Sequence, residues 1–334
     1  MDIVVPARDE ALTIGAAIGS LLAQDYPGPF RVILVDDNST DGTADLSLAA
    51  AGAGSTASRL TVIRLQSKPA GWSGKLWAMS RGIAASEAPL LLLTDADIVH
   101  DPRHLSTLVA KLLQSRLDLV SEMVRLECSS FAERALVPAF VYFFQMLYPF
   151  KRVNDPQSAV AAAAGGTVLI RREALQRMGG IDSIKDCLID DVALARAVKA
   201  RGSIFLGHSG LAASMRPYRS FADIWHMISR TAFTQLRHSP VLLTLTLLGL
   251  GVVWWVPAAA LLLGHGWVLG CGAVAFGLSA GSYQPTLARY GRSPLWALAL
   301  PLIALFYMAA TLGSALNYWR GRGARWKSRA YGAG

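Results

Sequence analysis

Two aspartates one residue apart, Asp95 and Asp97, directly follow the apolar run 90–94. A short apolar run without alternation predicts a strand buried on both faces, and carboxylates at its end are oxygen ligands of the kind that divalent cations prefer. In open α/β sheets, ligands bind beyond the carboxyl ends of the strands. The pair therefore indicates an enzyme that handles a nucleotide-linked substrate with a metal ion. An Asp-x-Asp tripeptide alone is also a common acidic turn that closes a strand.

Two earlier apolar runs also end in polar residues. Residues 3–5 lead into 6–10, and residues 32–35 lead into 36–39. Helical patterns alternate with these runs, at about 11–23, 41–52, 74–85 and 103–115. This alternation predicts an α/β domain, Rossmann-like and doubly wound around a parallel sheet. The three polar segments should then converge on one crevice at the carboxyl edge of the sheet.

The motifs occur in a fixed order along the chain: VPARDE at 5–10, VDDNSTDGT at 35–43, Gly74-Lys75, Asp95-Ala96-Asp97 and Ile189-Asp190-Asp191. This ordered set, over about residues 2–237, resembles that of the family 2 inverting glycosyltransferases, which have the GT-A fold. The segment 71–78 (GWSGKLWA) and the apolar C-terminal part most resemble the membrane-bound branch of hopene-associated and ceramide-glucosyltransferase-like enzymes.

The resemblance implies a nucleotide-sugar substrate, UDP-linked, and a divalent metal ion, Mg²⁺ or Mn²⁺. Asp97 is then the expected metal ligand, and Asp95 contributes through water or through the ribose. Such an ion would neutralise the charge that builds on the leaving diphosphate. Lys75 would contact the base or the phosphate. A lysine at this place is equally well explained as an exposed residue at a helix start.

The resemblance also assigns the nucleotide pocket. Asp37 would accept a hydrogen bond from the uracil ring. Three residues of the first motif would shape the base and ribose pocket: Pro6, Ala7 and Glu10. In the later Gln-x-x-Arg-Trp motif of the family, the segment 227–231 keeps only Arg230, which could hold the diphosphate through two parallel hydrogen bonds. The missing tryptophan argues against processive polymer synthesis.

Inversion requires a base for the acceptor hydroxyl, and the resemblance assigns that role to Asp191, with Asp190 in place of the usual glutamate. Helix starts favour aspartates in any case, through capping and the helix dipole. A neighbouring carboxylate would raise the pKa of Asp191, whereas a helix N-terminus would lower it. The turn Gly165-Gly166 is either a plain tight turn or a place where a sugar approaches the backbone.

The charge of the chain is concentrated at its C-terminal end. The net charge is +9, and no Asp or Glu follows Asp223. Nine basic residues do: Arg230, Arg237, Arg289, Arg292, Arg320, Arg322, Arg325, Lys327 and Arg329. Three uncharged apolar stretches, 241–263, 266–284 and 295–316, lie among them, each about as long as a bilayer is thick. We expect anionic lipid rather than nucleic acid to face this basic part.

These patterns predict a catalytic domain at 1–220, an interfacial amphipathic segment at 221–239, two or three transmembrane helices within 240–318 and a basic tail at 319–334. The aromatic segment 135–150 is too short to span a membrane. It belongs to a core or to an acceptor-facing surface. The three widely spaced cysteines indicate neither disulfides nor zinc, and suit a reducing cytosolic face.

With the catalytic domain in the cytosol, three full spans would place the basic tail outside, against the usual charge rule. Residues 266–284 are the weakest span. A first strand at Ile3 leaves no room for a signal peptide.

The function expected from the sequence is a membrane-anchored glycosyltransferase of the inner membrane, facing the cytosol, that moves a single sugar to a lipid hydroxyl, for example of a hopanoid or sphingolipid-like acceptor. Two alternatives stay open. One is transfer to a polyprenyl phosphate, whose anionic oxygen needs no base. The other is a catalytically idle nucleotide-sugar-binding membrane scaffold.

Overall fold

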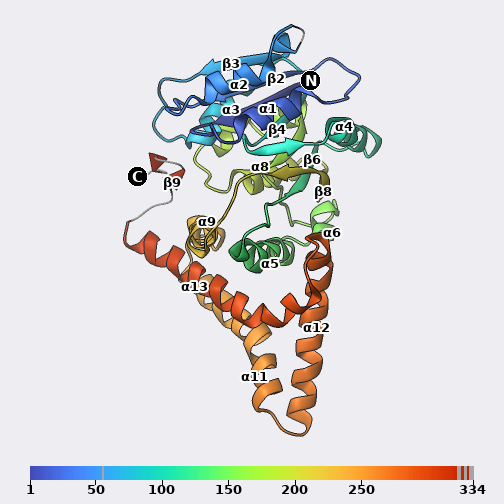
Figure 1. The fold of residues 1–334 in the computed structure, drawn as a ribbon, viewed down its shortest axis with the longest axis vertical. Helices are drawn as coiled ribbons and strands as arrows, with labels where there is room; N and C mark the ends of the chain where they lie inside the picture. The colour runs from blue at the N-terminus through green and yellow to red at the C-terminus, as the bar shows by residue number, and fades with distance from the viewer. Residues whose placement is uncertain (55, 322–324, 327–328, 331–334) are drawn as a thin grey trace. The chain divides into compact units, whose positions relative to one another are not determined.

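The structure, a computed structural model, describes residues 1–54, 56–321, 325–326 and 329–330. Its ribbon is drawn in Figure 1, and the chain divides into two compact units. The first unit contains Met1–Leu126, Tyr148–Arg216 and the described residues after 324, and the second contains Glu127–Leu147 and Pro217–Ala324.

The first unit is built on one eight-stranded sheet. Its strands are β1 (Asp2–Ala7), β2 (Arg31–Asp36), β3 (Leu60–Arg64), β4 (Leu90–Thr94), β5 (Ile98–His100), β6 (Leu119–Arg125), β7 (Thr167–Arg171) and β8 (Ile204–Ser214). They lie in the order β3-β2-β1-β4-β7-β6-β8-β5. The neighbours from β3 to β4 are parallel, as predicted. Beyond β4 the sheet is mixed, because β7 runs antiparallel to β4 and β6, and β5 antiparallel to β8.

The reversed direction of β7 matters for the site. Thr167, the first residue of β7, pairs with Thr94, the last residue of β4. The turn at Gly165 and Gly166 therefore lies at the same edge of the sheet as Asp95. An antiparallel strand thus brings its preceding loop to the edge where parallel strands end.

Helices cover both faces of this sheet. They are α1 (Ile14–Leu22), α2 (Thr43–Ala51), α3 (Gly74–Ala84), α4 (His104–Gln114), α6 (Phe150–Asn154), α7 (Arg172–Arg177) and α8 (Asp190–Lys199), with short 3₁₀ turns η1 (Ala57–Arg59) and η2 (Ile181–Ile184). Ile3 and Val5 of β1 belong to the core beneath α1 and α4. Val4 faces the other way, towards α3, where a Cβ on Gly82 would collide with its side chain. This alternation confirms a sheet buried on both faces, with the four predicted helices in place.

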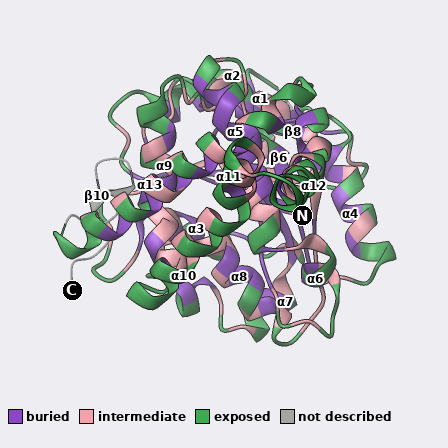
Figure 2. Cartoon of the chain, turned by 90° about the horizontal axis from the view of Figure 1, so that it is seen from below, coloured by how far each residue is buried: buried purple, intermediate pink, exposed green. Residues whose placement is uncertain are grey.

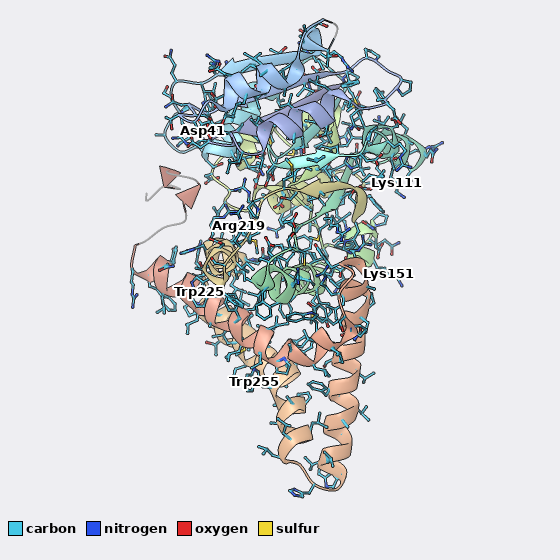
Figure 3. All side chains as sticks on the ribbon, viewed as in Figure 1. Asp41, Lys111, Lys151, Arg219, Trp225 and Trp255 are labelled. Carbon is cyan, nitrogen blue, oxygen red and sulfur yellow. The ribbon has the colours of Figure 1, made fainter. Side chains whose placement is uncertain are left out.

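The second unit is helical. It contains α5 (Phe131–Leu147), α9 (Phe221–Gln235), α10 (Pro240–Leu250), the π-helical turn η3 (Gly251–Trp255), α11 (Val256–Leu263), α12 (Trp267–Arg289), the 3₁₀ turn η4 (Pro294–Ala299) and α13 (Leu300–Trp319). Figure 2 shows exposed residues along α11 and α12. None of the α11 residues is buried. Trp255, labelled in Figure 3, is 39% exposed.

Helix α9 begins with a capping box formed by Ser220 and Asp223. It packs along α13. A Cβ on Gly313 of α13 would come within 2.7 Å of the ring of Trp225, which is labelled in Figure 3. Its apolar residues Ile224 and Ile228 are buried within the unit. The amphipathic pattern of 221–239 therefore reflects a helix that covers a core, and its place at a membrane interface stays a prediction.

Helix α5 lies in the core of the second unit. The Tyr142 and Phe143 rings contact that of Trp254 with centroids 6.0 and 6.2 Å apart, and Phe143 also contacts Tyr307 at 4.8 Å. The aromatic segment is thus a core element. The compact units also differ from the predicted boundary near residue 220, because these contacts group α5 with the C-terminal helices.

Among the described residues, two helices are long and apolar enough to cross a membrane: Pro240–Leu263 and Pro294–Trp319. Helix α12 has 23 residues but does not meet the same test, in line with its prediction as the weakest span. The short strands β9 (Arg325–Trp326) and β10 (Arg329–Ala330) pair antiparallel. The rest of the predicted basic tail beyond residue 321 lies outside the described residues.

Candidate active site

Lys75 lies at the start of α3 and makes two ion pairs. Ser73 caps the helix with its side chain, and its backbone N–H donates to the carbonyl oxygen of Lys185 at 2.8 Å, which ties α3 to the segment before α8. Lys75 Nζ lies 2.8 Å from Asp95 Oδ1 and 3.3 Å from Asp190 Oδ2. Its side chain is only 16% exposed. The interpretation of Lys75 as an exposed lysine is therefore wrong.

Asp191, the predicted base, lies beside this lysine. Its Oδ2 accepts a hydrogen bond from the backbone N–H of Gly165 at 2.9 Å, and its Oδ1 accepts one from Val192 at 2.8 Å. A Cβ on Gly165 would lie 3.3 Å from Lys75 Nζ and 3.4 Å from Asp191 Oδ2. Glycine at this turn thus allows both charged groups to approach the backbone. We call Lys75, Asp95, Asp190, Asp191 and Gly165 the lysine–aspartate cluster.

The cluster shifts the pKa values of its members. Burial, together with repulsion from Asp190, raises the pKa of Asp191 to about 6, although Lys75 and the two backbone N–H groups oppose this. Burial raises the pKa of Asp95 as well, against the attraction of Lys75. For Lys75, burial lowers the pKa, but Asp190 and Asp95 outweigh it, and the net shift is upward. Burial and Asp190 therefore outweigh the helix N-terminus at Asp191, and the carboxyl titrates in the range that suits a base.

A cavity of about 10 Å³ borders the cluster. Its polar lining comes from the cluster, and its apolar lining consists of Leu76, Met79, Leu93, Val168, Ile181, Ile184 and Leu194. The apolar lining limits access of water to Asp191, which is the physical cause of the burial effect on its pKa.

Asp97 is held by a residue that the motifs did not indicate. Arg216 Nε lies 2.8 Å from Asp97 Oδ2, and its Nη2 lies 2.8 Å from Glu10 Oε1. Ser214 Oγ also donates to Asp97 Oδ2, at 3.2 Å. Arg216 thus links the segments that follow β1, β4 and β8. Arg216 is the second residue after β8, a strand that the sequence patterns did not predict, so no motif pointed to it.

Asp37 is buried next to Arg8. Its backbone N–H donates to the carbonyl oxygen of Ala7 at 2.8 Å, so it adjoins the end of β1, where Pro6 is buried. Its carboxylate is fully buried, and Arg8 Nη1 lies 3.7 Å from Asp37 Oδ2. Asp37, Pro6 and Ala7, which were predicted to line the base pocket, therefore lie close together. Contact of Asp37 with a uracil ring would require this buried carboxylate to become accessible.

The donor set suits a divalent ion that is shared with a substrate. In the described part of the chain, no three His, Cys, Asp or Glu side chains are grouped as ligands of one metal. Asp95 and Asp97 offer carboxylate oxygens, and each also pairs with a cationic side chain. Mg²⁺ and similar ions take one or two protein carboxylates and complete their shell with phosphate and water oxygens. The two aspartates fit such an ion once Arg216 releases Asp97.

Arg230 lies on α9 in the second unit, with an exposed side chain. Its contact with a diphosphate stays a prediction. Among the described residues, no disulfide joins the three cysteines.

The fold and the residues at its carboxyl edge identify the class of protein. The chain belongs to glycosyl transferase family 2, whose family model matches residues 2–179. Its architecture is the GT-A fold followed by helices. The mannosyltransferase PcManGT from Pyrobaculum calidifontis, solved with GDP-Man and Mn²⁺, shares this fold with a TM-score of 0.58. The match covers 98% of this chain and 87% of that one at 21% identity, which shows likeness of fold alone.

Two curated relatives match part of the chain. Dodecaprenyl-phosphate galacturonate synthase of Rhizobium johnstonii is 31% identical over 122 residues, which is 36% of this chain and 34% of that protein. The succinoglycan biosynthesis protein ExoU of Rhizobium meliloti is 34% identical over 110 residues, 33% of this chain and 29% of that protein. The matches thus span about a third of the length of these relatives.

Proposed function

We propose that this protein is an inverting glycosyltransferase that transfers one sugar from a nucleotide donor, UDP-linked, to a hydroxyl group of a membrane lipid. The observation that carries this proposal is the carboxylate of Asp191, whose pKa of about 6 suits a general base at neutral pH. A hydroxyl acceptor needs such a base.

The sugar-donor half of the site is assigned to the ends of β1 and β4. A divalent ion on Asp97, with Asp95 near it, would neutralise the charge that develops on the leaving diphosphate. Binding of that ion requires Asp97 to exchange the Arg216 guanidinium for the metal. Arg216 then becomes available to pair with a phosphate oxygen, for which a planar guanidinium is well suited. The mannosyltransferase of similar fold, solved with GDP-Man and Mn²⁺, supports a nucleotide-sugar donor and a divalent ion.

The acceptor half is assigned to Asp191. The acceptor oxygen attacks the anomeric carbon from the side opposite the diphosphate. As the new bond forms, the bond from that carbon to the diphosphate oxygen breaks, the diphosphate leaves with the electron pair, and the acceptor proton passes to Asp191. The ion pairs of Lys75 with Asp95 and Asp190 hold the metal-binding segment and the base-bearing helix together. Lys75 is thus assigned a positioning role between the two halves.

The lipid acceptor is supported by the second unit. Two of its helices are long and apolar enough to span a membrane, and no acidic residue follows Asp223 in the sequence. We infer a protein of the inner membrane whose catalytic domain faces the cytosol. A hopanoid or a sphingolipid-like molecule fits the proposed acceptor class.

A polyprenyl phosphate is the second candidate acceptor. It is favoured by the likeness to the Rhizobium johnstonii relative, which is named as a dodecaprenyl-phosphate galacturonate synthase. An anionic phosphate oxygen attacks without a base, so this reaction would not depend on Asp191.

The proposal is tested with membranes that contain the full chain, radiolabelled UDP- and GDP-sugars, and extraction of the lipids. We expect label in a lipid fraction that survives mild acid, as a glycoside of a hydroxyl does and a glycosyl phosphate does not. Asp191→Asn should lower this transfer by about 10²-fold, while Asp155→Asn, at an exposed aspartate of the same unit, leaves it unchanged. Normal transfer by Asp191→Asn would favour the polyprenyl phosphate, and no transfer by any sugar would favour an idle binding scaffold.

A further inference from the structure

The turn that holds Asp191 is itself held by a buried threonine. Thr94 Oγ1 donates a hydrogen bond to the carbonyl oxygen of Gly166 at 2.7 Å. The neighbouring residue, Gly165, is the one whose N–H binds Asp191. Thr94 is 1% exposed and directly precedes Asp95. One hydroxyl therefore connects the strand that carries the metal-binding motif to the turn that binds the base.

Two buried histidines, His100 and His104, continue the chain of polar contacts from Thr94. His100 Nε2 lies 3.1 Å from Thr94 Oγ1, and His100 Nδ1 lies 2.8 Å from His104 Nδ1. The two histidines are 3% and 0% exposed. His104 Nε2 lies 3.3 Å from Glu122 Oε2 on β6. Neither histidine belongs to the site described above.

The direction of the hydrogen bonds in this chain follows from donor and acceptor chemistry. Thr94 gives its only proton to Gly166, since a carbonyl cannot donate, so it must accept from His100 Nε2–H. Burial and the neighbouring His104 lower the pKa of His100 to about 3, so His100 is neutral and its Nδ1 accepts. The proton between the two Nδ1 atoms therefore belongs to His104. This assignment places one proton on His100 Nε2 and one on His104 Nδ1.

A second hydroxyl fixes the other side of the same turn. Ser121 Oγ on β6 accepts from the backbone N–H of Ala164 at 2.8 Å and lies 3.1 Å from the carbonyl oxygens of Ala164 and Thr167. The four-residue turn 164–167 is therefore held from both strands that flank β7. A Cβ on Gly166 would lie 3.0 Å from Val124, so the turn also has little room to move.

We propose that Thr94, His100 and His104 form a positioning network that fixes the Gly165-Gly166 turn, and thereby the Asp191 carboxylate, relative to the metal-binding segment. Thr94 is the positioning residue that contacts the turn, and the histidines orient its hydroxyl. The consequence for turnover rests on the proposed function of Asp191, whereas the effect on the turn itself does not. The network gives a reason for polar side chains in a buried place where apolar ones would otherwise pack.

The test compares Thr94→Val with two controls in the full chain, held in detergent micelles. Thr94→Ser keeps the hydroxyl. Thr167→Val removes a buried hydroxyl from the residue that pairs with Thr94, and Thr167 Oγ1 has no hydrogen-bond partner in the described part of the chain. The readouts are the titration of the Asp191 carboxyl by ¹³C NMR, assigned by its loss in Asp191→Asn, and hydrogen exchange at Gly165. Neither readout needs a substrate.

Thr94→Val should weaken the hydrogen bond from the Gly165 N–H to Asp191. That hydrogen bond stabilises the ionised form of the carboxylate. The pKa of Asp191 should then rise by about half a unit or more, and exchange at Gly165 should accelerate about tenfold. Both controls should match the wild type. Equal values for Thr94→Val and Thr167→Val would overturn the proposal. If Thr94→Val does not fold, His100→Gln, which keeps an N–H donor, and His100→Leu, which does not, give the same comparison, and equal pKa values would again overturn it.

Discussion

The pH dependence of transfer follows from the lysine–aspartate cluster. A base acts in its ionised form, so activity should fall as the pH decreases through the pKa of Asp191, which is about 6. At pH 5 about a tenth of the Asp191 carboxyl groups would be ionised, and the rate should be about tenfold below its value at pH 8. The assay is transfer of radiolabel from the nucleotide sugar to extracted lipid at saturating donor, in membranes between pH 4.5 and 8.5.

A phosphate acceptor would give a similar profile, because the second pKa of a phosphate monoester is also about 6. Asp190→Asn separates the two explanations. Repulsion from Asp190 raises the pKa of Asp191, so removal of its charge should lower that pKa and move the loss of activity to lower pH. The pKa of an acceptor phosphate would not change. Asp186→Asn, four residues earlier in the sequence, serves as the control.

If the profile of Asp190→Asn coincides with that of the wild type, Asp191 is not the group that titrates. If Asp191→Asn has the rate of the wild type and still loses activity below pH 6, Asp191 is not the base.

Three further predictions concern the metal segment, the turn and the membrane. Arg216→Gln should strengthen Mn²⁺ binding by about fivefold or more in the absence of nucleotide, since the guanidinium no longer competes for Asp97. Calorimetry measures this affinity, with Arg219→Gln as the control. An unchanged affinity for Mn²⁺ in Arg216→Gln would contradict the prediction. Gly165→Ala should lower turnover by about tenfold with nucleotide affinity intact, because its Cβ presses on Lys75 and Asp191; Gly15→Ala, whose Cβ meets nothing within 4 Å, should be neutral, and equal kinetics of the two variants would argue against the close approach. The full chain should stay in the membrane pellet after carbonate extraction, and release without detergent would contradict the two spans.

The sequence predicted β1, β2, β4 and the helices α1 to α4 because apolar runs and helical spacing are local signals. The convergence of 6–10, 36–39 and 95–97 also followed, since the ends of parallel strands share an edge. The direction of β7 did not follow, because its five residues pair with strands far away in the sequence. Its reversal is what brings Gly165 to Asp191.

Local motifs indicated individual residues of the site but not the contacts between residues far apart in the sequence. Motifs indicated Asp97 and Asp191, but the partner of Asp97 is Arg216, which lies more than a hundred residues later and outside every motif. The environment of Lys75 depended on Ser73 and on the segment before α8, so its burial could not be read from residue type. Burial raises the pKa of Asp191, whereas its position at a helix N-terminus lowers it. Only the fold determines which effect is larger.

The most direct measurement of the central claim is transfer of labelled sugar to extracted lipid by membranes that carry the wild type, Asp97→Ala or Asp191→Asn, each assayed with and without EDTA. The proposed function predicts an acid-stable labelled lipid from the wild type alone, lost with EDTA and with either variant, while Asp191→Asn still binds the nucleotide in the presence of Mn²⁺. Transfer that is unchanged in Asp191→Asn, or that is unaffected by EDTA, would contradict it.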